Sequence, residues 1–150
     1  MSGESLVRDI KFRIRHTMLP VRNLERTIDF YTRLLGMDVM RLRDQPDQNM
    51  RVGYLGYGCE DEGPALELIQ TGDPGEHAQL PGWSGHVAIM VWKLYKLCET
   101  LKAEGVTLTR EPQPVRPGSQ DLVAWIQDPD GYFIELTERH TLTGPPLRRA

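Results

Sequence analysis

The chain has 150 residues, of which 39% are hydrophobic and 26% are charged, as is usual for a single soluble globular domain. Its net charge of -3 and pI near 5.8 give no electrostatic reason to expect nucleic acid or an anionic membrane as a partner. No apolar stretch is long enough to span a bilayer, no signal peptide is recognisable, and two cysteines cannot form a disulfide framework. We therefore expect a reduced, cytoplasmic domain with Cys98 in the core and Cys59 exposed.

The first half of the chain predicts a strand, a helix and three more strands. A strand is predicted over residues 13–21, with His16 on one face and Leu19 on the other. Asn23 is a suitable N-cap for the following helix, whose apolar residues recur at helical spacing until Gly36 ends it. The remaining strands are predicted over residues 37–42, 50–57 and 65–71, with loops over 43–49 and 58–64.

The second half repeats this order after a linker that is rich in Gly, Pro and polar residues. A strand is predicted over residues 85–91, and a helix begins near Leu94 and ends at Gly105. The later strands are predicted over 106–109, 122–127 and 132–137, with a Pro-rich loop over 111–120. The sequence Asp-Pro-Asp-Gly at 128–131 has the residue types of a tight turn between the last two strands.

Three spacings indicate that the two halves are copies of one unit. His86 follows His16 by 70 residues, Gly105 follows Gly36 by 69, and Glu135 follows Glu67 by 68. Each copy alone leaves an apolar face that needs a partner, so a duplicated unit is expected to pack on itself. We predict one domain over residues 1–150, with module one at about 12–71, a linker at about 72–83, module two at about 84–138, and tails at 1–11 and 139–150.

Four residues at matched positions of the repeat are candidate metal ligands: His16 and Glu67 in the first copy, and His86 and Glu135 in the second. Each lies opposite the more apolar face of its strand. Two imidazoles and two carboxylates suit Zn, Ni, Co, Mn or Fe(II). A structural histidine on a strand, or a half-exposed glutamate facing water, is the alternative at any one of these positions.

Six stretches carry a resemblance to a known family: residues 16–19, Leu24 with 27–37, 55–58, 66–68, 85–86 and 128–136. Together they resemble glyoxalase I (lactoylglutathione lyase) of the vicinal oxygen chelate superfamily, in its short bacterial form, over about residues 12–138. The resemblance implies an α+β fold in which two βαβββ modules form curved half-barrel sheets. It also implies a homodimer whose metal site is shared between subunits, with His16 and Glu67 from one chain and His86 and Glu135 from the other.

The resemblance further implies a reaction. The substrate would be the hemithioacetal of methylglyoxal and glutathione, and the product S-lactoylglutathione. The metal would polarise the substrate oxygens and stabilise an enediolate, while Glu135 moves the proton between neighbouring carbons and Glu67 assists as the second metal carboxylate. The short form favours Ni or Co as the metal, with Zn as a further candidate.

Two positions depart from the family pattern for binding glutathione. Pro20 stands where many of these enzymes have Arg, and Thr71 stands where they often have Asn. Losing the Arg removes a forked donor for a substrate carboxylate, and Arg22, on the same strand face, could replace its charge. Arg116 matches a basic position that binds the terminal carboxylate of the thiol in the family, although a solvated loop charge is an equal alternative. The expected thiol contacts are therefore Arg22, Thr71 and Arg116.

Other functions share this fold. A different thiol adduct or an acyl-CoA epimerisation would use the same metal site and the same proton abstraction next to a carbonyl. A ring-opening dioxygenase would use Fe(II) with two His and one carboxylate, so the second glutamate disfavours it. A non-catalytic small-molecule-binding relative would be expected to lack the four ligands. Fold likeness alone does not separate these classes.

Overall fold

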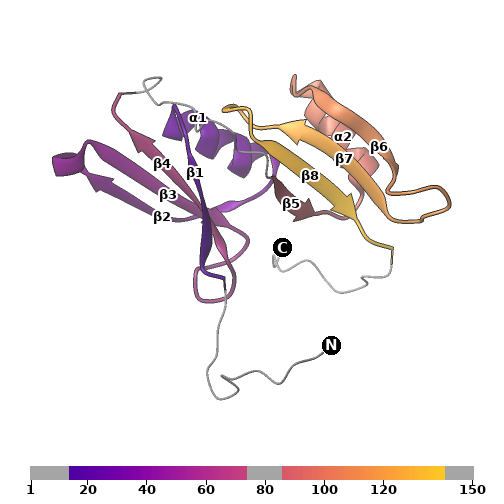
Figure 1. Ribbon diagram of the computed structural model, residues 1–150, viewed down its shortest axis with the longest axis horizontal. Coiled ribbons are helices and arrows are strands. Elements are labelled where there is room, and N and C mark those ends of the chain that lie inside the picture. Colours follow the sequence, from indigo (N-terminus) through magenta and orange to yellow (C-terminus); the bar gives the residue numbers. More distant parts are fainter. Residues whose placement is uncertain (1–13, 74–85, 141–150) are drawn as a thin grey trace, which may run out of the picture.

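A computed structural model describes residues 14–73 and 86–140 (Figure 1). Module one contains β1 (His16–Pro20), α1 (Leu24–Asp29), the π-helical turn η1 (Phe30–Leu34), β2 (Asp38–Gln45), the 3-10 turn η2 (Pro46–Gln48), β3 (Met50–Gly56) and β4 (Ala65–Thr71). Module two contains β5 (Val87–Met90), α2 (Leu94–Ala103), β6 (Leu108–Pro114), β7 (Leu122–Gln127) and β8 (Phe133–Glu138). Most of the predicted linker and tails lies outside the described residues.

The two modules have the same topology. Their four-stranded sheets have the orders β1-β4-β3-β2 and β5-β8-β7-β6. In each sheet the first strand of the module pairs in parallel with the last, and the other pairs are antiparallel. This is the element order that the repeat predicted and the α+β arrangement that the resemblance implied, and it places the first and last strands of each module side by side.

The predicted helix signals are confirmed. The side chain of Asn23 accepts a hydrogen bond from the backbone N–H of Arg26 at 2.9 Å, which caps α1. Gly36 and Gly105 follow the two helical segments with φ of 67° and 82°, a left-handed conformation that glycine adopts without the steric cost of a Cβ. The sequence did not predict that the first helix would widen into the π-helical turn η1.

Two predicted loops are wrong in part, because β2 continues to Gln45 and β6 continues to Pro114. Asp44 pairs with Arg51 of β3, and Pro114 pairs with Leu122 of β7. Pairing with a neighbouring strand thus overrides the polar and Pro-rich composition of these segments. The proline is tolerated because β6 is an edge strand of its sheet.

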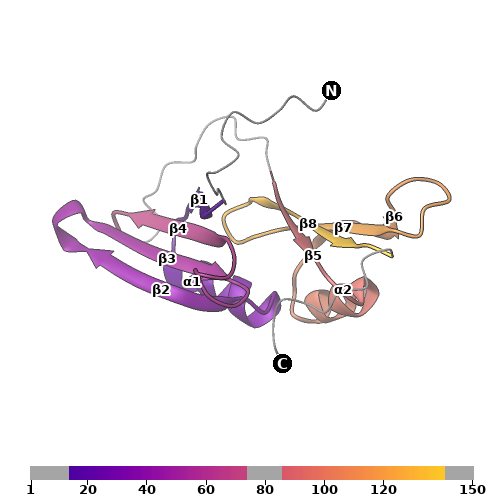
Figure 2. The same cartoon turned by 90° about the horizontal axis from the view of Figure 1, so that it is seen from below.

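The helices cover the apolar face of the sheets, and one core joins both modules. Figure 2 shows α2 against one face of the second sheet. Leu19 and Leu68 of module one and Ile134 and Leu136 of module two are at most 1% exposed and belong to the same apolar cluster. Cys98 lies in this cluster, and its burial raises the pKa of the thiol to about 11, whereas Cys59 is exposed.

The turn before β8 fastens module two to module one. Asp128 accepts a hydrogen bond from the hydroxyl of Tyr31 at 2.9 Å, and burial raises the pKa of this carboxyl. Asp130 accepts hydrogen bonds from the backbone N–H of Arg22 at 2.8 Å and from the hydroxyl of Thr27 at 2.7 Å. These groups are separated by about a hundred residues in sequence. The Asp-Pro-Asp-Gly sequence is therefore an inter-module clamp as well as a turn.

Replacing Asp130 with alanine should destabilise the protein. The Asp130 side chain is 3% exposed, so its loss leaves the Arg22 N–H and the Thr27 hydroxyl without their charged acceptor. We expect Asp130→Ala to lower the free energy of unfolding by about 3 kcal/mol, measured by urea denaturation. The exposed Asp47 offers a control. Replacing it with alanine should change the free energy of unfolding by less than about 0.5 kcal/mol. Equal stabilities of the two variants would contradict the clamp.

Candidate metal centre

The first His–Glu pair lies on the adjacent strands β1 and β4. Nε2 of His16 is 3.1 Å from Oε2 of Glu67, and the two side chains are 34% and 12% exposed. The parallel register sets Met18 opposite Glu67, so that His16 reaches the carboxylate diagonally across the strand pair. Leu66 and Leu68, on either side of Glu67, point into the core. Alternation along the strand thus holds the carboxylate on the opposite face.

The second pair repeats this geometry in module two. His86 directly precedes β5, and its Nε2 is 2.8 Å from Oε2 of Glu135 on β8. The two side chains are 41% and 24% exposed. Ile134 and Leu136 flank Glu135 and are fully buried on the other face. The predicted matching of His and Glu between the copies is therefore present in three dimensions.

The two pairs do not combine into one cluster within the chain. Over residues 14–73 and 86–140, no group of three or more His, Cys, Asp or Glu side chains could hold a metal ion. Figure 1 shows the reason, because β1 and β4 belong to one sheet and β5 and β8 to the other. Each pair therefore presents one imidazole and one carboxylate, half of the four-ligand set that the sequence predicted.

Sequence reasoning missed a tyrosine that supports the first pair. Tyr54 of β3 lies opposite Glu67 in the antiparallel ladder, and its hydroxyl donates a hydrogen bond to Oε1 of Glu67. That hydrogen bond is the main cause that raises the pKa of Tyr54, and burial of the phenol raises this pKa further. The guanidinium carbon of Arg41 lies 3.9 Å from the centroid of the Tyr54 ring, and Arg41 is held by two hydrogen bonds to Glu60, at 3.2 and 3.0 Å.

The second pair has a tryptophan in the corresponding place. Trp125 of β7 lies opposite Glu135, as Tyr54 lies opposite Glu67. Its ring meets the His86 ring edge-on, with 4.8 Å between centroids and 69° between planes. Both aromatic residues lie on the strand that precedes the glutamate strand in the chain. The antiparallel register between these two strands is the signal that could have identified them.

The predicted thiol contacts are scattered over three parts of the chain. Arg22 lies just beyond β1, where its backbone N–H is bonded to Asp130. Thr71 is exposed at the end of β4, and Arg116 is exposed between β6 and β7. Pro20 ends β1, and its carbonyl accepts a hydrogen bond from the hydroxyl of Tyr132 at 2.8 Å. Their role in binding a thiol stays a prediction.

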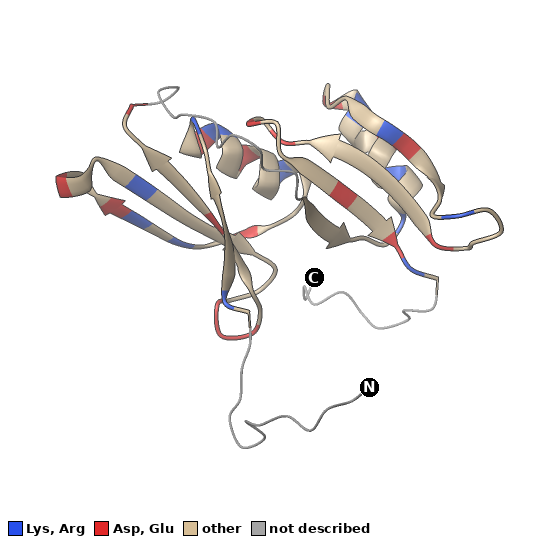
Figure 3. Ribbon diagram, viewed as in Figure 1, with Lys and Arg blue, Asp and Glu red and all other residues tan. Residues whose placement is uncertain are grey.

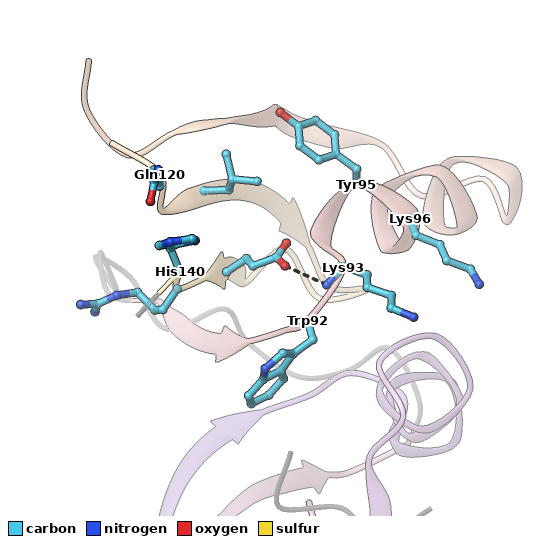
Figure 4. Close-up of a pocket in the computed structure, with 9 residues that line it drawn as sticks. Trp92, Lys93, Tyr95, Lys96, Gln120 and His140 are labelled. Atoms are coloured by element: carbon cyan, nitrogen blue, oxygen red, sulfur yellow. Dashed lines mark hydrogen bonds between the residues drawn. The ribbon is translucent and has the colours of Figure 1, made fainter. Parts of the chain in front are cut away.

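A cleft of about 780 Å³ lies elsewhere, beside the N-terminus of α2 (Figure 4). Its lining includes Trp92, Tyr95, Gln120 and His140, and none of the four predicted ligands. Glu138 accepts hydrogen bonds there from the backbone N–H groups of Lys93 and Leu94, at 3.1 and 2.8 Å, and so caps the helix. This cleft is separate from the candidate metal centre.

Charged residues of both signs are distributed along the described chain. Acidic and basic residues are interspersed over both sheets and both helices (Figure 3). Among the described residues, no helix has both the length and the apolar character that a membrane crossing requires. The His–Glu pairs are thus identified by geometry rather than by an electrostatic patch.

Comparison with known proteins agrees with the fold. Residues 13–136 match the Glyoxalase/Bleomycin resistance protein/Dioxygenase superfamily, and the chain belongs to this superfamily. It is 40% identical to a probable lactoylglutathione lyase of Vibrio cholerae over 84% of this chain and 90% of the relative. It is 39% identical to a lactoylglutathione lyase of Escherichia coli O157:H7 over 84% of this chain and 92% of the relative.

A solved structure extends the comparison to three dimensions. The trypanothione-dependent glyoxalase I of Leishmania major superimposes on the chain with a TM-score of 0.75 and 34% sequence identity. The match covers 87% of this chain and 89% of that one. The α+β architecture that the resemblance implied is thereby confirmed as the glyoxalase fold.

Proposed function

We propose that this protein is a metal-dependent lactoylglutathione lyase (glyoxalase I) that isomerises the hemithioacetal of methylglyoxal and glutathione to S-lactoylglutathione. The observation that carries the proposal is the pair of matched His–Glu half-sites, at 3.1 and 2.8 Å. Relatives named lactoylglutathione lyase, at about 40% identity over most of the chain, support the same activity. We place the enzyme in the cytoplasm.

The donor atoms fit a divalent transition metal. His16 and Glu67 each turn a donor atom toward the other on the open face of the first sheet, and His86 and Glu135 do so on the second. Two imidazole nitrogens and two carboxylate oxygens suit Ni or Co, which we favour, and also Zn. When bound, the metal would supply Lewis-acid polarisation of the substrate oxygens.

The half-sites require a second chain to complete a four-ligand centre. We propose a homodimer in which module one of one chain faces module two of its partner. Exposed apolar residues on the strands that carry the ligands support this arrangement: Met18 is 44% exposed, Met90 40% and Phe133 45%. Apolar side chains gathered around a functional site mark a surface that a partner covers. The interface would be isologous, so one dimer would hold two equivalent centres.

Glu135 is the residue that we propose moves the proton. It would take the proton from the carbon next to the substrate carbonyl and return it to the neighbouring carbon, as general acid and base in turn. The side chain is 24% exposed, twice the exposure of Glu67. Trp125 packs beside the paired His86 and so helps to hold the imidazole next to this carboxylate. Glu67 would bind the metal and assist the transfer.

The identity of the thiol is the finer part of the proposal. We propose glutathione, with Arg22, Thr71 and Arg116 contacting it. The solved Leishmania major relative is described as trypanothione-dependent, so a different thiol adduct is the second candidate. Replacing Arg22 with alanine should raise KM for the adduct if its charge meets the thiol, and an unchanged KM would contradict that contact.

Subunit complementation tests the shared centre. His16→Ala alone and His86→Ala alone each damage both centres of a homodimer, and each variant should be nearly inactive. A heterodimer of the two variants has one centre with both changes and one centre with neither. Co-refolding them in equal amounts should therefore restore about a quarter of wild-type isomerase activity, because half of the dimers are mixed and half of their centres are intact.

The mixture distinguishes the possible outcomes. A centre built within one chain would stay damaged in every molecule, so no recovery after mixing would contradict the shared arrangement. A control mixture of His16→Ala with Glu67→Gln should show no recovery, because both changes lie in module one. Recovery in that control would also contradict the proposal. Absence of isomerase activity in the wild-type protein would reject the function itself.

A further inference from the structure

The two half-sites differ in the aromatic residue that faces the glutamate. The register places Arg41 and Tyr54 in line with Glu67 in module one, and Arg110 and Trp125 in line with Glu135 in module two. Both modules have an arginine at the outer position. At the position opposite the glutamate, module one has the phenol of Tyr54 and module two has the indole of Trp125. An indole has one N–H donor and no hydroxyl. The two copies of the repeat therefore differ at a position next to the proposed ligands.

In module one, the two oxygens of the Glu67 carboxylate have different partners because Tyr54 bonds to one of them. Oε1 of Glu67 accepts the hydrogen bond from the hydroxyl of Tyr54, and Oε2 faces Nε2 of His16 at 3.1 Å. Hydrogen bonds from a phenol to a carboxylate are strong because the acceptor is charged. One oxygen of Glu67 is thus occupied by the protein itself, and the other faces the candidate ligand.

The tyrosine ring is itself firmly placed. Tyr54 is 6% exposed, and the guanidinium of Arg41 covers its face. Arg41 is in turn held by the two hydrogen bonds from its guanidinium to Glu60. Side chains locked in this way by packing and outer hydrogen bonds hold a ligand in a fixed orientation.

In module two, Glu135 has no comparable restraint. Within residues 14–73 and 86–140, no hydrogen bond reaches Oε1 of Glu135, and Oε2 faces Nε2 of His86 at 2.8 Å. Trp125 packs against His86 and Phe133 rather than bonding to the carboxylate. Among the described residues, this glutamate therefore has one carboxylate oxygen without a hydrogen-bond donor.

We propose that Tyr54 is a positioning residue that holds Glu67 as a fixed ligand through Oε2, whereas Trp125, at the matching position of module two, makes no such hydrogen bond to Glu135. The inference rests on the proposed function and assigns unequal roles to two glutamates that the repeat makes equivalent. The hydroxyl of Tyr54 acts through Glu67 and touches no substrate. Its contribution should therefore appear in metal binding before it appears in turnover.

The test compares Tyr54→Phe with Tyr57→Phe, using Co(II) as the probe. Tyr57 also donates its hydroxyl, to the carbonyl of Leu35 at 2.9 Å, so its replacement likewise removes one hydrogen-bonded phenol hydroxyl. Affinity is measured by competition with a chelator, and the visible absorption of bound Co(II) reports its coordination geometry. Tyr54→Phe should weaken Co(II) binding by about 10–100-fold and change the spectrum, whereas Tyr57→Phe should do neither.

The outcomes separate this inference from the function on which it rests. Wild-type affinity and an unchanged spectrum in Tyr54→Phe would overturn it, even if the variant were less stable. Equal changes in both variants would also overturn it, because the effect would then be structural. A wild-type protein that binds Co(II) without isomerising the hemithioacetal would reject the proposed function, while the two variants would still decide the role of Tyr54. A wild-type protein that binds no Co(II) would overturn both.

Discussion

Removal of the divalent metal should abolish isomerase activity, and Ni or Co should restore it more fully than Zn. The four proposed ligands divide into two His–Glu pairs, and neither pair in one chain forms a cluster of three metal-binding groups in the described residues. Without a metal, nothing else in either pair offers the Lewis acid that the proposed reaction needs. The measurement is the turnover of methylglyoxal with glutathione after chelation and separate addition of each metal.

The metal experiment also discriminates between functions. Stoichiometric metal binding without isomerase activity would move the proposal to another thiol adduct or to an acyl-CoA epimerisation. Protein that binds no metal would match a non-catalytic member of the superfamily. A fully active apoprotein would contradict the mechanism. Because each centre is shared in the proposed dimer, loss of the metal should also weaken the dimer, which analytical ultracentrifugation can measure.

Replacing Glu135 with glutamine should lower kcat by about 10²–10⁴-fold, the usual contribution of a general acid–base group. Glutamine keeps the size of the side chain and one oxygen that can meet a metal, but it cannot take up the substrate proton. We therefore expect Glu135→Gln to retain bound metal and to lose turnover at saturating metal and substrate. Glu67→Gln should differ, because its first effect should be weaker metal binding.

A surface glutamate of the same module provides the control. Glu111 lies on the edge strand β6, is exposed, and pairs with Lys102 at 3.1 Å. Glu111→Gln should leave kcat and KM unchanged, because exposed ion pairs contribute little to stability and this one lies away from both His–Glu pairs. A kcat of Glu135→Gln within a factor of about three of the wild type would contradict the role of Glu135 as the proton-transfer group.

The sequence by itself determined the elements, their repeat and the faces of the strands. Asn23 and Gly36 act over a few residues, so their capping roles could be deduced without any tertiary contact. The position of Glu135 opposite the core followed from the two-residue period of a strand. The repeat predicted that His86 and Glu135 occupy places equivalent to those of His16 and Glu67, and the family resemblance implied which His accompanies which Glu.

Only the tertiary structure decided which residues meet across strands and across modules. Tyr54 reaches Glu67 because of the β3–β4 register, and Asp130 reaches Arg22 because the turn of module two packs on α1. Neither contact has a local signature, since register and packing depend on the whole apolar core. The continuation of β6 to Pro114 was hidden for the same reason, because a partner strand stabilised it. Local patterns specify the elements, and long-range packing of the elements specifies the neighbours of each ligand.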